Sequence, residues 1–392
     1  MEEKIVIEQL DESGYTRREF VKRAAGVGLS LAALGSLGVE PALGRATRDK
    51  VKWISPRGTL NVMDDYNLVV PIKMGYFSEL GLDVTLIGGP FDATACTKFV
   101  AQHQADMGYP SPGILTFSIG SGIPVLSIWE QYPAQVFDFA LPAKSKITSP
   151  KQLAGKKIAL GSIGWTSIVN PILAEVGVNA KTVKYVELGP AWTQATALGQ
   201  ADAALVWEGL RGQLIGQAGG FGSGISLKYL IGSKFSKGPS NVYAVRKADL
   251  SDPKRKDIYT RFLKGVVMGF EFARANPRAA AEITYNQYPA LQALISPQVA
   301  LESMAELASG YSVEARKGKG WGYHELPAWQ RYLDNVYKLG QTKQHFTTSD
   351  VLTNDFVGPA NSGANKAKAH KDAKAYKLDK YFSATKVPNY PL

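Results

Sequence analysis

The sequence predicts an α/β protein made of two successive units followed by a helical region. Between residues 51 and 141, short apolar runs alternate with segments of helical spacing, a pattern typical of parallel strands joined by helical crossovers. The alternation restarts at residue 149 and continues to residue 207, and from Asp257 onward the spacing is helical. The 392 residues suffice for two domains with substantial cores.

The first unit is expected to consist of strands bounded by turn residues and of short helices between them. The segment from Leu68 to Leu80 has helical apolar spacing and ends at Gly81, a residue suited to a helix C-cap. The expected strands are 51–54, 82–87, 105–109, 125–129 and 135–141, and the expected helices are 68–80, 93–104 and 113–120.

The second unit begins with a helical turn and a strand within residues 149–160. Further strands are expected at 183–186 and 203–207, and helices at 166–176 and 192–198. A strand at 241–245 is a candidate to return to the first unit. Four helices should follow, at 258–275, 279–285, 297–309 and 328–339, and the Lys-, Ala- and Asn-rich end of the chain is expected to wrap the surface.

The composition excludes several classes of site. Apolar residues make up 45% and charged residues 20%, a globular balance, and the formal net charge is +11. The Lys and Arg residues are dispersed apart from a run near the C-terminus, and no nucleic-acid-binding signature accompanies them, so the charge does not favour nucleic acid. The single cysteine, Cys96, excludes an intrachain disulfide. We expect no cofactor and no metal site, because the histidines lie far apart in the sequence, at His103, His324, His345 and His370.

The N-terminal segment has the order of an export signal. Arg17-Arg18 stand in a twin-arginine pattern, Ala24 to Val39 is apolar and uncharged, and small residues follow near 44–46. The alternative is a membrane anchor, but the apolar stretch is shorter than the roughly 20 residues that a span needs. A lipoprotein anchor is excluded because no cysteine lies near the cleavage region. We therefore expect a cleaved twin-arginine signal peptide at residues 1–46.

Four segments in one order carry a family resemblance. Residues 71–84 look like the pattern G-Y-F-x-x-x-G-L-D-V, and Ala105-Asp106-Met107-Gly108 resembles G-x-A-D-x-G. Residues 153–159 resemble L-K-G-K-K-I-A, and residues 199–203 resemble G-x-V-D-A. Together they resemble the periplasmic binding proteins of the nitrate/sulfonate/taurine and thiamine-pyrimidine type, the NMT1/THI5-like, SsuA- and ThiY-like group.

This resemblance implies a type II periplasmic-binding-protein fold, with two Rossmann-like lobes joined by a two-strand hinge and followed by C-terminal helices. It implies lobe I at 47–140 and 240–340, lobe II at 141–239, and a C-terminal extension at 341–392. The chain crossings should fall near 139–143 and 239–243. The implied function is that of an extracytoplasmic solute-binding component of an ABC importer, a periplasmic monomer with permease and ATPase partners and no catalytic residues.

Ligand-binding candidates follow from the position of loops at the ends of strands. In open α/β sheets ligands lie beyond the carboxyl ends of strands, where helix N-termini offer free N–H groups. Some of these loop residues also have a purely structural interpretation. Gly88-Gly89-Pro90 can form a simple turn, residues 162–167 can provide an N-cap, and Asp64 and Asp65 can be solvated or capping residues. The candidates are Asp65, Tyr66, Asn67, Gly89, Phe91, Asp92, Tyr109, Ser111, Gln131, Tyr132, Ser162, Gly164, Trp165, Thr166, Ser167, Trp192, Trp207 and Glu208.

The aromatic residues among these candidates indicate the kind of ligand. They fall at expected strand ends or in loops, where Trp and Tyr present flat apolar faces with a polar edge. An arginine pair is the usual partner of a fully charged oxyanion, but no arginine stands among the candidates and Arg211 is the nearest. We therefore expect an aromatic or heterocyclic solute, with a carboxylate or sulfonate as a possible polar group, in preference to nitrate.

Three other functions are compatible with parts of the sequence. The family also includes THI5-like pyrimidine-synthesis enzymes, which use a histidine and a Cys-rich motif, but this chain has only Cys96. A periplasmic hydrolase stays open because a catalytic triad is spatial, not sequential. A solute sensor without a transport role cannot be distinguished from an importer component by sequence.

Overall fold

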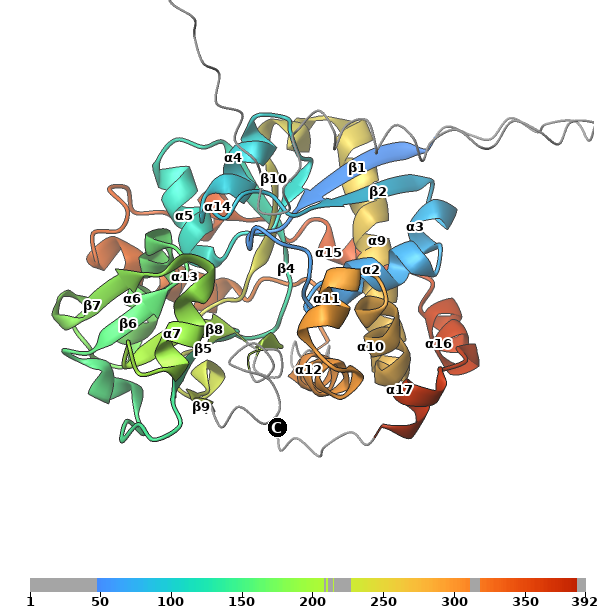
Figure 1. The fold of residues 1–392 in the computed structure, drawn as a ribbon. Coiled ribbons are helices and arrows are strands. Elements are labelled where there is room, and N and C mark those ends of the chain that lie inside the picture. The colour runs from blue at the N-terminus through green and yellow to red at the C-terminus, as the bar shows by residue number, and fades with distance from the viewer. Residues whose placement is uncertain (1–47, 208, 211–213, 215–226, 311–317, 386–392) are drawn as a thin grey trace, which may run out of the picture. The chain divides into compact units, whose positions relative to one another are not determined.

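The computed structural model describes residues 48–207, 209–210, 214, 227–310 and 318–385. The expected export segment lies outside these residues, as do Glu208 and Arg211. The described chain contains two five-stranded sheets with helices packed around them, which confirms the predicted α/β class (Figure 1). None of the described helices is both long and apolar enough to cross a membrane.

The first sheet has the strand order β2-β1-β3-β10-β4. Strand β1 is parallel to β2 and β3, whereas β10 is antiparallel to β3 and β4. The strand expected at 241–245 therefore does return to the first unit. The strands are β1 Asp49–Ile54, β2 Leu82–Ile87, β3 Met107–Gly108, β4 Val125–Glu130 and β10 Val242–Arg246.

The second sheet has the order β7-β6-β8-β5-β9. Strand β6 is parallel to β7 and β8, and β5 is antiparallel to β8 and β9. Each sheet thus combines three parallel strands with one central antiparallel strand, β10 in the first sheet and β5 in the second. Each of these two strands directly follows a chain crossing between the sheets. The strands are β5 Phe137–Pro142, β6 Lys157–Leu160, β7 Lys184–Glu187, β8 Ala203–Trp207 and β9 Leu227–Leu230.

The first chain crossing lies earlier than expected. Strand β5 pairs with β8 in the second sheet, with Phe137 opposite Trp207, so the chain crosses at 131–136 and not at 139–143. The apolar run that forms β5 suits a buried strand of either sheet, and only its pairing partners decide to which sheet it belongs. The return crossing lies between β9 and β10, at 231–241.

The two crossings are hydrogen-bonded to each other. The Gln131 amide donates to the Asn241 carbonyl at 2.9 Å. The Tyr132 amide donates to Ser240 Oγ at 2.9 Å, and Ser240 Oγ donates to the Tyr132 carbonyl at 2.8 Å. Glu130 Oε1 accepts from the Ser240 amide at 3.0 Å. This ladder holds the connecting segments side by side between the sheets.

Short helices connect the strands. The helix expected at 68–80 is divided, because Gly75 adopts a positive φ of 77° that ends α2 and starts α3. We refer to the first sheet with its helices as lobe I and to the second sheet with its helices as lobe II. The connecting helices are α2 Tyr66–Lys73, α3 Tyr76–Glu79, α4 Ala95–Ala101 and α5 Pro112–Gly120 in lobe I, and α6 Thr166–Glu175 and α7 Trp192–Ala197 in lobe II.

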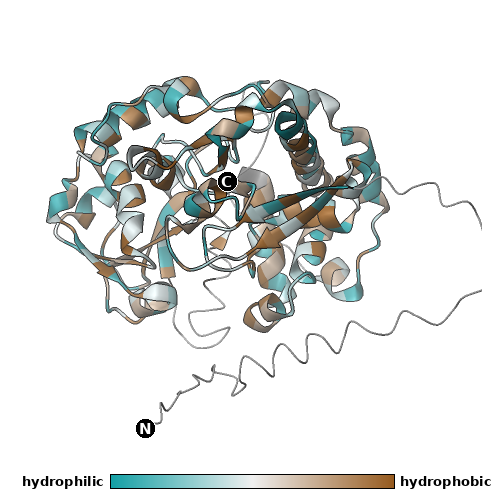
Figure 2. Cartoon of the chain, turned by 90° about the horizontal axis from the view of Figure 1, so that it is seen from above, coloured by the Kyte–Doolittle hydropathy of each residue, from teal (hydrophilic) through white to brown (hydrophobic). Residues whose placement is uncertain are grey.

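Helices after residue 250 complete lobe I. The hydrophobic strands lie inside and hydrophilic residues cover the outer helices (Figure 2). The longest helix, α9, packs on α2 and on the later helix α16. These helices are α9 Pro253–Ala275, α10 Pro277–Tyr285, α11 Pro289–Leu294, α12 Pro297–Gly310, α13 Leu326–Lys338, α14 Thr348–Val351, α15 Val357–Gly363, α16 Lys366–Ala375 and α17 Lys380–Ala384.

The C-terminal segment is bound to lobe I by specific contacts. His370 Nε2 lies 2.7 Å from Glu271 Oε2, and Tyr376 donates to Glu282 at 3.1 Å. Arg278 donates to the carbonyls of Phe382 and Thr385. Helices α16 and α17 accordingly lie beside α9 and α10 (Figure 1). The described part of the expected C-terminal extension is therefore packed against lobe I as part of its structure.

An Ala-Asp motif joins neighbouring strands in both lobes. Asp106 Oδ2 accepts from the Lys52 amide at 2.9 Å, and the Asp106 amide donates to the Lys52 carbonyl at 2.8 Å. In the second sheet Asp202 and Lys157 make the same pair of bonds, at 2.8 and 2.9 Å. The motif therefore holds the start of β3 against the middle of β1 and the start of β8 against the start of β6.

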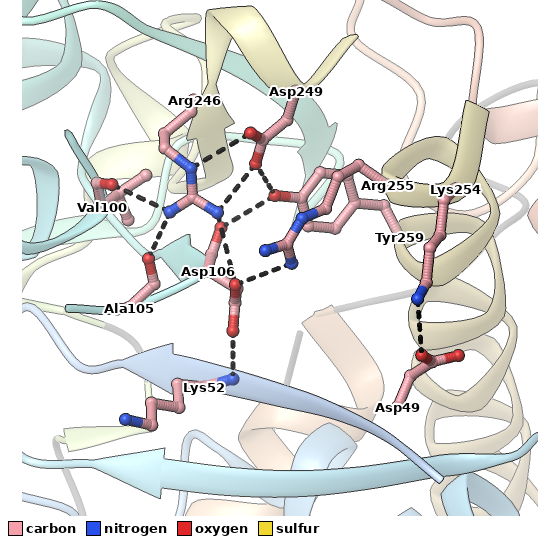
Figure 3. Close-up of polar contacts among 10 residues, drawn as sticks. All are labelled: Asp49, Lys52, Val100, Ala105, Asp106, Arg246, Asp249, Lys254, Arg255 and Tyr259. Atoms are coloured by element: carbon pink, nitrogen blue, oxygen red, sulfur yellow. Dashed lines mark hydrogen bonds and ion pairs between the residues drawn. The ribbon is translucent and has the colours of Figure 1, made fainter. Parts of the chain in front are cut away.

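In lobe I the motif carboxylate also binds two arginines. Asp106 Oδ1 accepts from Arg255 at 3.0 Å and from Arg246 at 3.3 Å (Figure 3). Arg246 further donates to the Val100 and Ala105 carbonyls. The cluster fastens α9 and β10 to the start of β3.

Replacing Asp106 with alanine is expected to lower the free energy of unfolding by about 2–3 kcal/mol, because two charge-assisted bonds and one amide bond are lost. The matched Asp202→Ala variant loses only the amide bond and should cost about 0.5–1.5 kcal/mol. Urea denaturation followed by tryptophan fluorescence measures both. Equal losses in the two variants would show that the arginine contacts contribute nothing.

Candidate functional site

A pocket lies between the two sheets. Its walls come from both lobes, at positions that follow the carboxyl ends of β1, β3, β6 and β8, where α/β sheets bind ligands. The lining residues are Pro56, Arg57, Asp64, Ala93, Tyr109, Ser111, Ile114, Tyr132, Val136, Phe137, Trp165, Ile168, Leu205, Trp207 and Asn241.

Lobe II contributes a cluster of three tryptophans. The rings of Trp165 and Trp207 lie 6.1 Å apart, nearly perpendicular at 87°. Trp192 stacks on Trp207 at 6.1 Å and 19°, and its Nε1 donates to the Leu205 carbonyl at 2.8 Å. Trp165 and Trp207 thus face the pocket, while Trp192 supports them from behind.

Lobe I contributes tyrosines to the opposite wall. Tyr109 packs against Trp53 and Tyr243, with ring centroids 5.8 and 5.4 Å away. Burial raises the pKa of the Tyr109 hydroxyl above its usual value, so this group stays protonated at neutral pH. Tyr132 lies at the first crossing and also lines the pocket. Aromatic faces from both lobes therefore enclose the same space.

An arginine lines the pocket, contrary to the expectation that none would. Arg57 Nη2 lies 2.5 Å from Asp65 Oδ1, and the two side chains are 8% and 4% exposed. The guanidinium carbon lies 5.6 Å from the Tyr109 ring centroid. Burial lowers the pKa of Arg57, but the carboxylates of Asp65 and Asp64 outweigh that effect and raise it above its usual value. Arg57 is therefore charged.

Arg57 follows β1 directly, so the strand-end rule applied to residues 55–58 would have found it. The expected candidates after β1 begin only at Asp65. Gly58 has a positive φ of 68°, and a Cβ there would meet the Phe91 backbone at 3.0 Å. The loop thus folds back tightly on the loop after β2, and this path brings Arg57 to the pocket.

Three buried polar atoms of lining residues have no hydrogen-bond partner within the described chain. Two are donors, Arg57 Nε in lobe I and Trp207 Nε1 in lobe II, and one is an acceptor, Asn241 Oδ1 at the return crossing. Buried polar groups are normally satisfied. The pocket therefore presents a small set of unsatisfied groups from both lobes to whatever occupies it.

Five of the expected residues line the pocket: Tyr109, Ser111, Tyr132, Trp165 and Trp207. Ser111 also caps α5, since its Oγ accepts from the Ile114 amide at 3.2 Å. Three more contact lining residues. Asp65 pairs with Arg57, Trp192 packs on Trp165 at 5.4 Å, and Phe91 lies 5.9 Å from Trp165.

Other expected residues are engaged outside the pocket lining. Tyr66 packs on Phe270, with ring centroids 5.9 Å apart, and Asn67 donates to the Tyr243 hydroxyl at 2.7 Å. Asp92 Oδ1 accepts from the Thr94 amide at 2.7 Å and from the Thr94 hydroxyl at 2.9 Å, so it serves the turn before α4. Gly89 forms a turn with a positive φ of 68°, and Gln131 belongs to the ladder between the crossings.

Residues 162–167 form a seam between the lobes. Thr166 Oγ1 donates to the Ile163 carbonyl at 2.9 Å, and Ser167 Oγ donates to the Gly164 carbonyl at 2.8 Å. Their hydroxyls therefore serve the local turn, and neither they nor Ser162 and Gly164 line the pocket. A Cβ at Gly164 would meet the Ala93 Cβ at 2.7 Å. A Cβ at Gly113, in α5, would meet the Ser167 carbonyl oxygen at 2.3 Å.

A serine, a histidine and an asparagine are hydrogen-bonded in series away from the pocket. His324 Nε2 lies 2.7 Å from Ser127 Oγ, and His324 Nδ1 lies 2.9 Å from Asn354 Oδ1. Ser127 and His324 are fully buried, and Gly322 and Leu352 bridge to β4 on either side. Because a substrate cannot reach the serine, this trio is a structural link between β4 and the C-terminal segments.

Among the described residues no cluster suited to a metal ion occurs.

The family assignment rests on residues 64–280, which match the NMT1/THI5 like family model. This stretch covers more than half of the chain. The chain belongs to the NMT1/THI5-like family. The part that defines this NMT1/THI5-like protein runs from the loop after β1 into α10, so it includes the three tryptophans but not Arg57.

Solved structures share the fold of the NMT1/THI5-like chain at low identity. The alkanesulfonate-binding protein SsuA of Xanthomonas axonopodis pv. citri, bound to MOPS, is 13% identical with a TM-score of 0.59, covering 79% of this chain and 99% of that one. The aliphatic sulphonate binding protein SsuA of Escherichia coli is 12% identical, with a TM-score of 0.56 and coverages of 77% and 91%. The desulfurization enzyme DSZB is 11% identical, with a TM-score of 0.51 and coverages of 81% and 99%.

These similarities show that the fold is the periplasmic-binding-protein fold. The same fold serves binding proteins and an enzyme, so the function has to be argued from the site. No curated protein matches the chain.

Proposed function

We propose that this protein is the solute-binding component of an ABC importer and that it captures a small aromatic or heterocyclic organic acid. The observation that carries the proposal is the lining of the pocket between the lobes. Trp165 and Trp207 lie on one side of it, and Tyr109 and Tyr132 lie on the other. Flat apolar walls of this kind favour a planar ligand.

The polar group of the ligand is assigned from the unsatisfied donors. Arg57 Nε and Trp207 Nε1 lie on different lobes, and both lack a partner among the described residues. A carboxylate or sulfonate oxygen can accept from such donors. Because Arg57 already pairs with Asp65, the site suits a single anionic group attached to an apolar body better than a small inorganic oxyanion.

Binding follows from the position of the pocket between two lobes. A ligand that contacts both lobes stabilises their closed arrangement by its differential affinity for that arrangement. The permease then recognises the closed form. The similarity to periplasmic sulfonate-binding proteins supports this role and a periplasmic location. Export by the twin-arginine route is proposed from the Arg17-Arg18 pattern alone. Permease and ATPase subunits are the proposed partners of a monomer.

An enzymatic role is the alternative, since DSZB shares the fold and THI5-like members share the family. No cysteine or histidine lines the pocket in the described chain. Cys96 is buried in α4, and burial raises the pKa of its thiol to about 12, so the reactive thiolate is absent at neutral pH. A solute sensor differs from an importer component only in its partners, and measuring uptake after deletion of the gene separates the two.

A thermal-shift screen tests the proposed ligand class. Benzoate, benzenesulfonate and a pyrimidine carboxylate should raise the melting temperature and change the tryptophan fluorescence, because the ligand lies against Trp165 and Trp207. Taurine and nitrate serve as non-aromatic anions. If taurine or nitrate shifts the melting temperature while every aromatic acid leaves it unchanged, the proposed ligand class is wrong.

The tryptophan cluster provides a mutational test. We expect Trp165→Ala to weaken binding of the best aromatic acid by about 1–3 kcal/mol, since Trp165 faces the pocket. Trp192→Ala should have a smaller effect, because Trp192 acts through Trp207. Isothermal titration calorimetry measures both, with Tyr381→Ala as a control, since Tyr381 is 60% exposed and remote in sequence from every lining residue. Unchanged affinity in both tryptophan variants would contradict this pocket as the site.

A further inference from the structure

Lysines gather at one edge of the second sheet, the edge opposite the ligand pocket. Strands β6, β7 and β8 begin at this edge, β5 ends there, and β9 begins there with Leu227 opposite Pro142. Segments far apart in the sequence therefore meet at this end of lobe II. We name these residues the lysine edge: Lys144, Lys146, Lys151, Lys156, Lys157, Lys181, Lys184 and Lys228.

The lysine edge carries almost no compensating charge. Its segments, 142–157, 180–184, 198–203 and 227–228, contain one carboxylate, that of Asp202. Asp202 Oδ2 accepts from the Lys157 backbone amide at 2.8 Å. Among the described residues no ion pair involves a lysine of this edge, although Lys228 Nζ donates to the Ser145 carbonyl at 2.5 Å. The edge is therefore a concentrated region of positive charge.

The corresponding edge of the first sheet is built differently. There Arg246 pairs with Asp249 at 2.8 Å and with Asp106 at 3.3 Å, and Arg255 pairs with Asp106 at 3.0 Å (Figure 3). Cations and carboxylates balance in that cluster. The contrast lies in composition: two arginines face two carboxylates in that cluster, whereas the eight lysines of the lysine edge have one carboxylate among their segments.

The residue types of the lysine edge favour binding to an extended anionic surface, such as a membrane, over binding to a single anion or a nucleic acid. Lysine is a hydrated point charge on a flexible stem, whereas arginine supplies the planar fork that selects phosphate groups of nucleic acids. The edge contains no arginine, and no aromatic side chain among its segments offers a platform for stacking bases. Lys144, Lys146 and Lys156 line one shallow groove that also includes Gly199. Next to Gly199, Leu198 is 55% exposed.

We propose that the lysine edge binds a membrane surface rich in anionic phospholipid, with Leu198 as an apolar contact among the lysines. Clusters of lysines near a membrane are attracted to anionic lipids, and exposed apolar side chains add to that attraction. Because the edge lies at the strand starts, attachment there leaves the pocket at the strand ends accessible to solute. The binding protein is thereby held at a membrane without a membrane-spanning helix in its described part.

Vesicle co-sedimentation of the full chain tests this proposal. Vesicles of phosphatidylcholine with about one third phosphatidylglycerol should sediment the protein at low salt, and pure phosphatidylcholine vesicles should not. High salt should release it, because exposed charges are screened. Lys144→Glu/Lys146→Glu/Lys156→Glu should weaken binding by at least about tenfold. The matched control, Lys371→Glu/Lys374→Glu/Lys377→Glu near α16, makes the same change in net charge and should stay within about twofold of the unmodified chain.

Three results overturn the proposal. The first is absence of sedimentation with phosphatidylglycerol vesicles at low salt. The second is an equal loss in the two triple variants, which would assign binding to the total charge of the protein. The third is capture of the unmodified chain by immobilised polyglutamate without binding to vesicles, which would assign the edge to an acidic protein partner. None of these results depends on the solute in the pocket, so they leave the proposed function untouched.

Discussion

The Arg57→Met variant is expected to lower the free energy of unfolding by about 3–5 kcal/mol, because it leaves the buried Asp65 carboxylate without its cation. The pair is close, with 2.5 Å between Arg57 Nη2 and Asp65 Oδ1, and both side chains are less than one tenth exposed. Methionine keeps an unbranched side chain in the same space, so the loss reports mainly the charge. Urea denaturation at neutral pH, followed by tryptophan fluorescence, measures it.

Two further variants control this experiment. The double variant Arg57→Met/Asp65→Asn removes both charges and should recover part of the loss, since neutral replacement of a buried pair is far less costly than breaking it. Lys50→Met removes an exposed cation from β1 and should change the free energy of unfolding by less than about 0.5 kcal/mol. If the double variant is less stable than Arg57→Met alone, the ion pair is not the origin of the effect.

The same variant also tests the proposed role of Arg57 in binding. Where Arg57→Met remains folded, affinity for the best carboxylate or sulfonate from the screen should fall at least about tenfold, because one of two unsatisfied donors is removed. Affinity for a neutral aromatic analogue should change less. Equal losses for the acid and the neutral analogue would show that Arg57 only maintains the shape of the pocket.

The Gly113→Ala variant is expected to weaken ligand binding about 5–150-fold, which corresponds to an overpacking cost of about 1–3 kcal/mol placed on the closed arrangement. The added Cβ would lie 2.3 Å from the Ser167 carbonyl oxygen. Because this neighbour is backbone at the start of α6, it cannot swing aside like the end of a side chain. The lobes have to separate to relieve the contact.

Small-angle X-ray scattering and calorimetry distinguish this effect from damage to either lobe. We expect the variant with saturating ligand to retain a larger radius of gyration than the parent, while its free energy of unfolding stays within about 1 kcal/mol of the parent value. Gly358→Ala is the matched control, since a Cβ there meets no atom within 4 Å and its φ is not positive. Parental affinity and scattering in Gly113→Ala would contradict closure at this seam.

Much of the fold was predictable because strands and helices are largely local. The apolar runs at 51–54, 82–87 and 203–207 lie within observed strands, and the helical spacing after residue 257 identified α9. The predicted helix at 68–80 failed at Gly75, since glycine at a positive φ ends one helix and begins another in a way that apolar spacing does not record. The assignment of β5 to the first sheet failed because pairing is a long-range property.

The residues of the candidate site also fall into two groups, those that a local sequence pattern predicts and those that long-range packing places. The sequence by itself determined that Tyr109, Tyr132, Trp165 and Trp207 stand at strand ends, and strand ends of one sheet meet at one edge whatever the details of packing. Only the tertiary structure decided that Trp192 supports the wall from behind, and that Thr166 and Ser167 use their hydroxyls on local carbonyls. It also decided that Arg57 reaches the pocket, because its position depends on how the loop after β1 folds against the loop after β2, a contact between segments that no local pattern specifies.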